Sequence, residues 1–162
     1  MSTVSLNQKN YTLPGVPVVV ICADGWANEY ISLGFAHGEL PNLARLASDG
    51  YYGLARGALP SFTNVNNCSI VTGTPPFETG IGGNYIIDPE SGEELMTNSS
   101  RFLRNDTILA AASQAGRKVA MVTAKDKLRA LLSKGMNGIS ISAEQADEVS
   151  IELTGVDNIG LL

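Results

Sequence analysis

Apolar runs and polar turn signals alternate along this chain, so strand-like and helix-like segments follow one another. The strongest apolar run is Val16–Cys22, a largely β-branched stretch that is typical of a parallel strand buried on both faces. The same reasoning predicts strands over Tyr51–Ala58 and Lys118–Thr123, with a short extended piece at Asn84–Ile87. The strands are separated by segments with helical spacing, which favours parallel pairing.

Helical periodicity is clearest over Thr63–Thr72, where Val65 and Cys68 repeat on one face and Gly73 follows as a stop signal. Further helices are predicted over Pro41–Ser48, Asp106–Ala115 (capped by Asp106), Asp126–Leu132 and, as a last acidic helix, Ala143–Val149. The alternation predicts an α/β fold with a doubly wound, mostly parallel sheet and helices on both faces.

Composition narrows the class of protein. The chain has 162 residues, of which 44% are hydrophobic and 17% charged, enough for one domain with a sizeable core. The net charge of −5 argues against nucleic acid or an anionic membrane surface as a partner. Residues 1–11 lack the apolar core of a signal peptide, so we expect a cytoplasmic protein, with Cys22 and Cys68 both buried and reduced.

Asp24 directly follows the strongest predicted strand. Ligands of open α/β sheets bind beyond the carboxyl ends of the strands, so a carboxylate there can ligate a cation such as Zn²⁺. The alternative is an ordinary turn residue, because Asp-Gly is a common turn pair. Asp24 alone does not decide between these two interpretations.

Thr63 stands at the start of its predicted helix. A hydroxyl at that place is either a helix cap or a nucleophile, since the free amides of a helix N-terminus bind phosphate-like anions. A hydroxyl needs a base or a metal to attack at neutral pH, and the chain has no local Ser-His-Asp arrangement. Activation by a metal held by Asp24 is therefore the stronger catalytic hypothesis.

Together these segments resemble the alkaline phosphatase superfamily. The motifs are Asp24-Gly25 after an apolar strand, Thr63-Asn-x-x-Asn-x-Ser-Ile-Val-Thr-Gly73 and Pro76-x-x-Thr-Gly80. Within that superfamily the chain looks most like the phosphonoacetate hydrolases. This finer resemblance is carried by Gly80-Ile-Gly-Gly-Asn84-Tyr85 and Val122-Thr-Ala-Lys-Asp-Lys-Leu128 and extends over nearly the whole chain.

The resemblance implies an alkaline-phosphatase-like α/β core with two Zn²⁺ ions and a small anionic substrate, phosphonoacetate, whose C–P bond is cleaved to acetate and phosphate. Thr63 would be nucleophile and metal ligand, and Asp24 a ligand of the same ion. Asn84 would donate to a phosphonyl oxygen, while Lys125 and Lys127 would face the anionic substrate, one or both contacting its carboxylate. From the residues alone, Asn84 could equally be a plain turn residue, and the two lysines could equally be solvated residues at the start of a helix.

The chain carries few further metal ligands. Its single histidine, His37, lies in a loop-like stretch without ligand spacing. We therefore expect residues 1–162 to be the N-terminal part of one catalytic domain, with its core cut short, and the isolated chain to aggregate or be inactive. A phosphodiesterase or nucleotide pyrophosphatase of the same superfamily and a non-catalytic remnant stay as alternatives. The sequence leaves open whether the chain forms a homo-oligomer.

Overall fold

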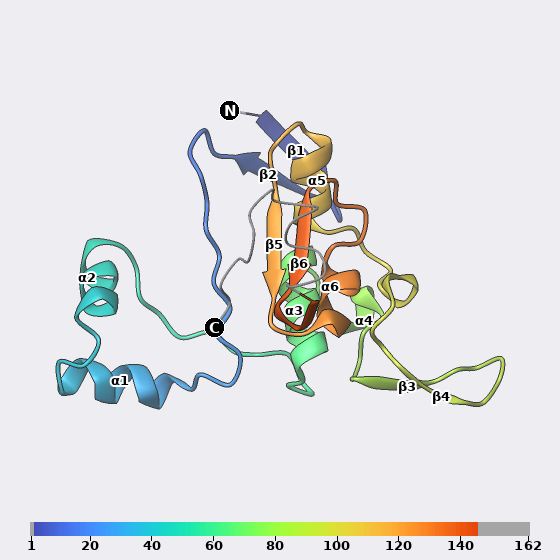
Figure 1. Cartoon of the computed structure of the whole chain (residues 1–162), viewed down its shortest axis with the longest axis horizontal. Helices are drawn as coiled ribbons and strands as arrows, with labels where there is room; N and C mark the ends of the chain where they lie inside the picture. Colours follow the sequence, from blue (N-terminus) through green and yellow to red (C-terminus); the bar gives the residue numbers. More distant parts are fainter. Residues whose placement is uncertain (1, 146–162) are drawn as a thin grey trace. The chain divides into compact units, whose positions relative to one another are not determined.

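The computed structural model of the chain describes residues 2–145 (Figure 1). Its elements, in chain order, are β1 (Ser2–Leu6), β2 (Lys9–Leu13), α1 (Asn28–Ala36), α2 (Pro41–Asp49), α3 (Thr63–Thr72), α4 (Pro76–Thr79), β3 (Tyr85–Ile87), β4 (Glu94–Met96), the 3₁₀ turn η1 (Ser100–Phe102), α5 (Ile108–Gln114), β5 (Ala120–Thr123), α6 (Asp126–Leu132), β6 (Ile139–Ser142) and the 3₁₀ turn η2 (Ala143–Gln145).

The strands that the structure describes form three two-stranded sheets. β1–β2 and β3–β4 are antiparallel hairpins, whereas β5 and β6 pair in parallel from Ala120↔Ile139 to Thr123↔Ser142. Parallel strands need a crossover, and α6 supplies it, lying beside the β5–β6 pair (Figure 1). The predicted α/β class is confirmed.

The main core joins elements that are distant in sequence. Val65 and Cys68 of α3 pack with Leu131 and Leu132 of α6 and with Met121 of β5. Ile81 and Leu103 complete the cluster. One apolar cluster thus fixes α3 against the β5–α6 segment, and both of these carry residues of the predicted site.

Local signals located most helices correctly. α3 and α6 have the predicted bounds, and Gly73 ends α3 in the left-handed conformation with φ of 64°. α5 begins later than expected, because its cap is Thr107, whose hydroxyl accepts a hydrogen bond from the Ala110 N–H at 3.0 Å. The prediction of Asp106 as the cap was wrong. The acidic helix predicted over residues 143–149 lies mostly outside the described residues, and its first three residues form η2.

Two predicted strands are absent from the described part of the chain. Val16–Cys22 has no strand structure, and its side chains are exposed, with Val19 82% and Ile21 86% accessible. Tyr51–Ala58 is likewise irregular. A strand needs a neighbouring strand that exchanges backbone hydrogen bonds with it. No strand of the described residues pairs with either segment. The prediction that Cys22 is buried was also wrong.

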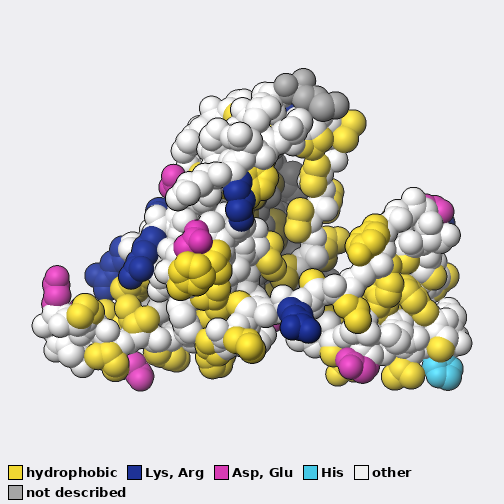
Figure 2. All heavy atoms as spheres, turned by 180° about the vertical axis from the view of Figure 1, so that it is seen from behind, with side chains coloured by type: hydrophobic (Ala, Val, Ile, Leu, Met, Phe, Trp, Pro, Cys, Tyr) yellow, Lys and Arg dark blue, Asp and Glu magenta, His cyan; other side chains and the backbone are white. Residues whose placement is uncertain are grey.

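The chain divides into two compact units. The first contains the residues up to Pro17 and from Ala58 onward, and the second is Val18–Gly57. Within residues 2–145, all buried residues belong to the first unit. Numerous hydrophobic side chains also lie at the molecular surface (Figure 2).

Among the helices that the structure describes, none combines the length and the apolar character that a membrane crossing requires.

Candidate functional site

Thr63 is the first residue of α3. Phe62 occupies the capping position before it, in extended conformation (φ −106°, ψ 155°). The Phe62 side chain makes no capping hydrogen bond. The Thr63 hydroxyl therefore stands one position beyond the place where a capping hydroxyl would act. Thr63 is half-buried, and the core residues Val65 and Cys68 hold the helix below it.

Asp24 lies in a turn of the second unit. Gly25 has a φ of 74°, which the missing side chain permits, and the Trp26 N–H donates to the Ala23 carbonyl at 3.4 Å. The turn expected at Asp24-Gly25 is confirmed, whereas the strand expected before it is not formed. Asp24 is exposed.

Asn84 follows the Gly82-Gly83 pair and directly precedes β3. Its carbonyl accepts a hydrogen bond from the Thr97 N–H at 2.9 Å, which closes the base of the β3–β4 hairpin. Its side-chain Oδ1 is buried and has no hydrogen-bond partner among the described residues. A buried amide oxygen without a partner is costly, so the Asn84 amide is not an ordinary solvated turn side chain.

Two residues that the sequence did not single out as functional connect Asn84 to α3. Asn64, next to Thr63, is 2% exposed, and its Nδ2 donates to the Thr97 carbonyl at 3.1 Å. Thr97 is fully buried, and its hydroxyl donates to the Gly83 carbonyl at 2.6 Å. Asn64 precedes the core residue Cys68 by four positions, and this spacing was the only sequence signal of its burial.

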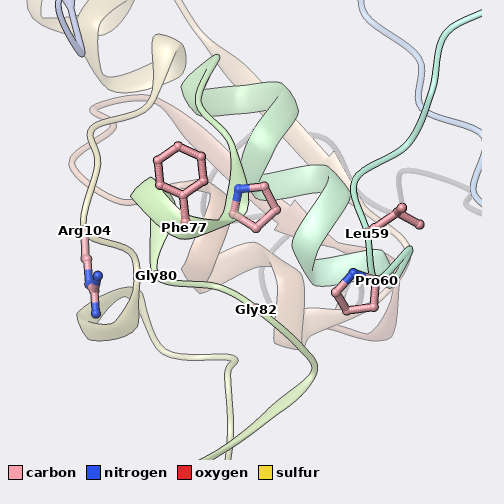
Figure 3. Close-up of a pocket in the computed structure, with 7 residues that line it drawn as sticks. Leu59, Pro60, Phe77, Gly80, Gly82 and Arg104 are labelled. Atoms are coloured by element: carbon pink, nitrogen blue, oxygen red, sulfur yellow. The ribbon is translucent and has the colours of Figure 1, made fainter.

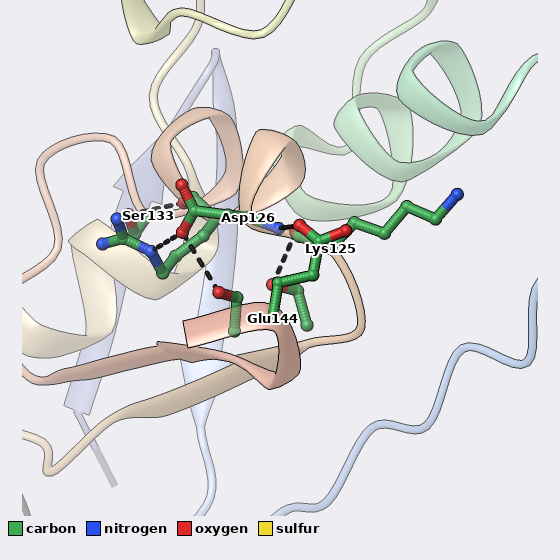
Figure 4. A network of polar contacts seen from close by, with 7 residues as sticks. Lys125, Asp126, Ser133 and Glu144 are labelled. Carbon is green, nitrogen blue, oxygen red and sulfur yellow. Dashed lines mark hydrogen bonds and ion pairs between the residues drawn. The ribbon is translucent and has the colours of Figure 1, made fainter. Parts of the chain in front are cut away.

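Lys125 and Lys127 lie at the junction of β5 and α6. Lys125 occupies the capping position in extended conformation (φ −120°, ψ 137°), and Lys127 lies in the first helical turn. Figure 4 shows the Lys125 side chain extending away from the polar network around Asp126. Because Lys125 precedes the helix, the two lysines are not confined to the divergent directions of residues i and i+2 within a helix.

The polar network beside the lysines fixes the start of α6. The Asp126 carboxylate accepts from Arg129 Nε at 2.5 Å and from the Ser142 hydroxyl at 3.1 Å (Figure 4). The hydrogen bond from Arg129 is the main cause that lowers the pKa of Asp126, whereas partial burial opposes it. The Glu144 carboxylate accepts from the Asp126 N–H at 2.7 Å, at the end of the helix where negative charge is favoured.

The first unit also has a shallow cavity of about 440 Å³ (Figure 3). Its lining is mainly apolar, with one cation, and consists of Leu59, Pro60, Pro76, Phe77, Gly80, Gly82 and Arg104. Gly80 is required there, because it has a φ of 79° and an added Cβ would come within 2.8 Å of Arg104 Nε. Neither Thr63 nor Asn84 lines this cavity.

The described residues do not form a complete metal site. No group of three or more His, Cys, Asp and Glu side chains able to hold a metal ion occurs within residues 2–145. A catalytic zinc site generally uses three protein ligands besides its open position. The Asp24 carboxylate and the Thr63 hydroxyl have the right donor chemistry, but they supply only part of a ligand set.

Comparison with known proteins defines the class first. The model of the family "Type I phosphodiesterase / nucleotide pyrophosphatase" matches residues 18–131, and the chain belongs to this family. The matched region contains Asp24, Thr63, Asn84, Lys125 and Lys127.

The solved structures narrow the resemblance. The chain is similar to phosphonoacetate hydrolase from Sinorhizobium meliloti 1021 in complex with phosphonoformate, with 44% identity and a TM-score of 0.88. The complex of that enzyme with phosphonoacetate matches at 43% identity with the same TM-score. Each match covers 98% of this chain and 40% of the other. The chain therefore spans about two-fifths of the length of these relatives, and the predicted alkaline-phosphatase-like fold is confirmed.

Proposed function

We propose that this chain is the part of a phosphonoacetate hydrolase that carries the nucleophile and the substrate-recognition residues. The observation that carries the proposal is the position of Thr63 at the first residue of α3, in a chain 44% identical to such an enzyme. The proposal keeps the expectations that residues 1–162 belong to one catalytic domain and that the protein is cytoplasmic.

The proposed reaction has two steps. The Thr63 Oγ attacks the phosphorus, an O–P bond forms, and the C–P bond breaks. The electron pair stays on the methylene carbon, which takes a proton and leaves as acetate. Water then cleaves the phosphothreonine and releases phosphate, which restores the Thr63 hydroxyl. The amides at the start of α3 and the Asn84 side chain would bind the phosphonyl oxygens through both steps.

Lys125 and Lys127 are proposed to bind the substrate carboxylate. Both are cations beside the first turn of α6, where the helix dipole does not favour positive charge. Glu144 and Asp126 offset that cost, since both carboxylates lie at the same helix end. α6 packs against α3 through Leu131, so one rigid core carries the proposed nucleophile and the proposed carboxylate site.

The proposal includes two zinc ions. Asp24 and Thr63 would contribute to one of them, and bound there the ion would favour the alkoxide form of the threonine. A catalytic zinc site uses about three protein ligands, so the remaining ligands would come from outside the described residues.

The experiment measures phosphate release from phosphonoacetate, in zinc-containing buffer, by a polypeptide that contains these residues together with the remaining metal ligands. Replacing Thr63 with Ala should lower kcat/KM by about 10³-fold or more, because the attacking oxygen is lost, whereas T63S should retain part of the activity. T3A on the exposed strand β1 is the control and should behave as wild type. A wild-type protein without phosphate release, or a T63A variant as active as wild type, would contradict the proposal.

A phosphodiesterase or pyrophosphatase is the second candidate, because the family model is named for those activities. The double variant K125A/K127A separates the two. It should lower phosphonoacetate turnover by about 10²-fold and leave cleavage of an aryl phosphodiester within a few-fold. K118A, which removes an exposed lysine before β5, is the matched control. Equal losses on both substrates, or efficient wild-type cleavage of the diester alone, would favour the second candidate.

A further inference from the structure

Thr97 forms a buried connection that neither the proposed chemistry nor the family resemblance accounts for. It follows β4 directly, is fully buried, and uses each of its polar groups in a hydrogen bond. Its N–H donates to the Asn84 carbonyl and its hydroxyl to the Gly83 carbonyl, while its own carbonyl accepts from Asn64. The Asn64 Nδ2 also approaches the Thr97 hydroxyl oxygen at 3.4 Å.

The two ends of this connection are segments of the proposed site. Asn64 is the residue after the proposed nucleophile, in the first turn of α3, and is 2% exposed. Gly83 and Asn84 form the loop that carries the proposed phosphonyl donor. The first turn of α3 therefore holds the Asn84 loop through a single buried residue.

The loop needs such a connection. Gly83 and Asn84 precede a three-residue strand, and that hairpin is exposed beyond its base, with Tyr85 53% and Ile87 64% accessible. An exposed two-stranded hairpin has little stability of its own. Gly82 and Gly83 add backbone freedom, so the position of Asn84 depends on contacts made at the base of the hairpin.

We propose that Asn64 and Thr97 are positioning residues that hold the Asn84 side chain in place relative to Thr63. The inference rests on the proposed function, because it assigns Asn84 to the phosphonyl group that Thr63 attacks. Neither residue touches the substrate in this proposal, and both act through the Asn84 loop. A displacement of about 1 Å in a reacting geometry costs on the order of 10² in rate.

The kinetic test is a double-mutant cycle on phosphonoacetate turnover. T97V removes the hydroxyl at nearly constant volume and should lower kcat by about 10²-fold, and T97S should restore most of it. In an N84A background T97V should have almost no further effect on kcat, because Thr97 is proposed to act on the reaction only through the Asn84 side chain. T107V, which removes an equally buried hydroxyl at the cap of α5, is the control and should not change kcat of the folded protein. Full additivity of T97V and N84A would overturn the proposal.

Hydrogen exchange supplies an arm that needs no turnover. The Thr97 amide donates to the Asn84 carbonyl, so N64A should speed its exchange by about 10-fold or more and leave the Ala111 amide of α5 unchanged. An unchanged Thr97 amide in N64A would overturn the proposal, whatever the activity. A wild-type protein without phosphonoacetate turnover whose Thr97 amide responds to N64A would refute the proposed function and retain Asn64 as the anchor of the loop.

Discussion

The two compact units of this chain differ in how they are held together. The first unit has a closed apolar core, in which Val65, Cys68 and Leu131 are fully buried. The second unit, Val18–Gly57, has two helices and no buried residue, and its apolar side chains from Val18 to Ile21 are exposed. Val16–Cys22, the segment predicted to be the strongest buried strand, lies mostly in this second unit, which is the less buried of the two.

This difference separates the two halves of the proposed chemistry. Thr63, Asn84 and the two lysines lie on elements that share one core or are hydrogen-bonded to it. Asp24 lies on a turn that follows an exposed extended segment. The proposed substrate-recognition residues therefore lie on the unit that has a buried core, and the proposed metal ligand Asp24 lies on the unit that has no buried residue.

The two cysteines test this comparison with the largest expected effect. Burial raises the pKa of the Cys68 thiol to about 12, so at pH 8 only about one molecule in 10⁴ carries the reactive thiolate. Cys22 is exposed. In the native protein Cys22 should react with a maleimide about 10³-fold faster than Cys68, as measured by mass spectrometry of labelled peptides.

Guanidinium unfolding should make the two labelling rates comparable, and C22S should remove the fast phase. Slow labelling of Cys22 in the native protein would mean that the Val18–Ile21 region is covered in solution. The second unit would then not differ from the first in the exposure of its apolar side chains.

A pair of leucines tests the same contrast in stability. L131A removes a fully buried side chain of the first unit and should cost about 2–5 kcal/mol of the free energy of unfolding. L54A removes a side chain of the second unit that is 77% exposed and should stay within about 0.5 kcal/mol. Urea unfolding followed by circular dichroism measures both. A cost of 2 kcal/mol or more for L54A would show that Leu54 is packed in solution.

Helices were predicted more accurately from the sequence than strands. α3 and α6 were located to the residue because stop signals and apolar periodicity are local. Val16–Cys22 was wrong because a strand depends on a distant partner, which the apolar run does not specify. The β1–β2 hairpin was missed because its turn places Asn7 and Gln8 at positive φ, and glutamine is not a usual signal for that geometry.

The candidate site shows the same limit. The pattern around Thr63 and Asn84 was visible because it lies in short motifs. The link through Asn64 and Thr97 joins residues 33 positions apart and became visible only when the structure placed the base of the hairpin against α3. Buried side-chain hydrogen bonds of this kind leave no periodic trace in a sequence.

The smallest effect concerns the ion pair that begins α6. The Asp126 carboxylate is 32% exposed and its pKa is lowered, mainly by the hydrogen bond from Arg129. A lowered pKa means that the charged form is favoured in the folded state. The stabilisation is therefore present above about pH 4, the range of a free aspartate, and is lost as the pH falls through the lower folded value.

D126N should thus lower the free energy of unfolding at pH 7 by less than about 1 kcal/mol, since the pair is partly solvated. The difference from wild type should shrink below about pH 4, where the wild-type carboxylate also becomes protonated. D49N, on the exposed helix α2 of the second unit, is the matched control and should show no comparable pH-dependent loss. Chemical unfolding at pH 3 and pH 7 measures both variants. A pH-independent deficit for D126N would show that Asp126 acts through packing rather than through its charge.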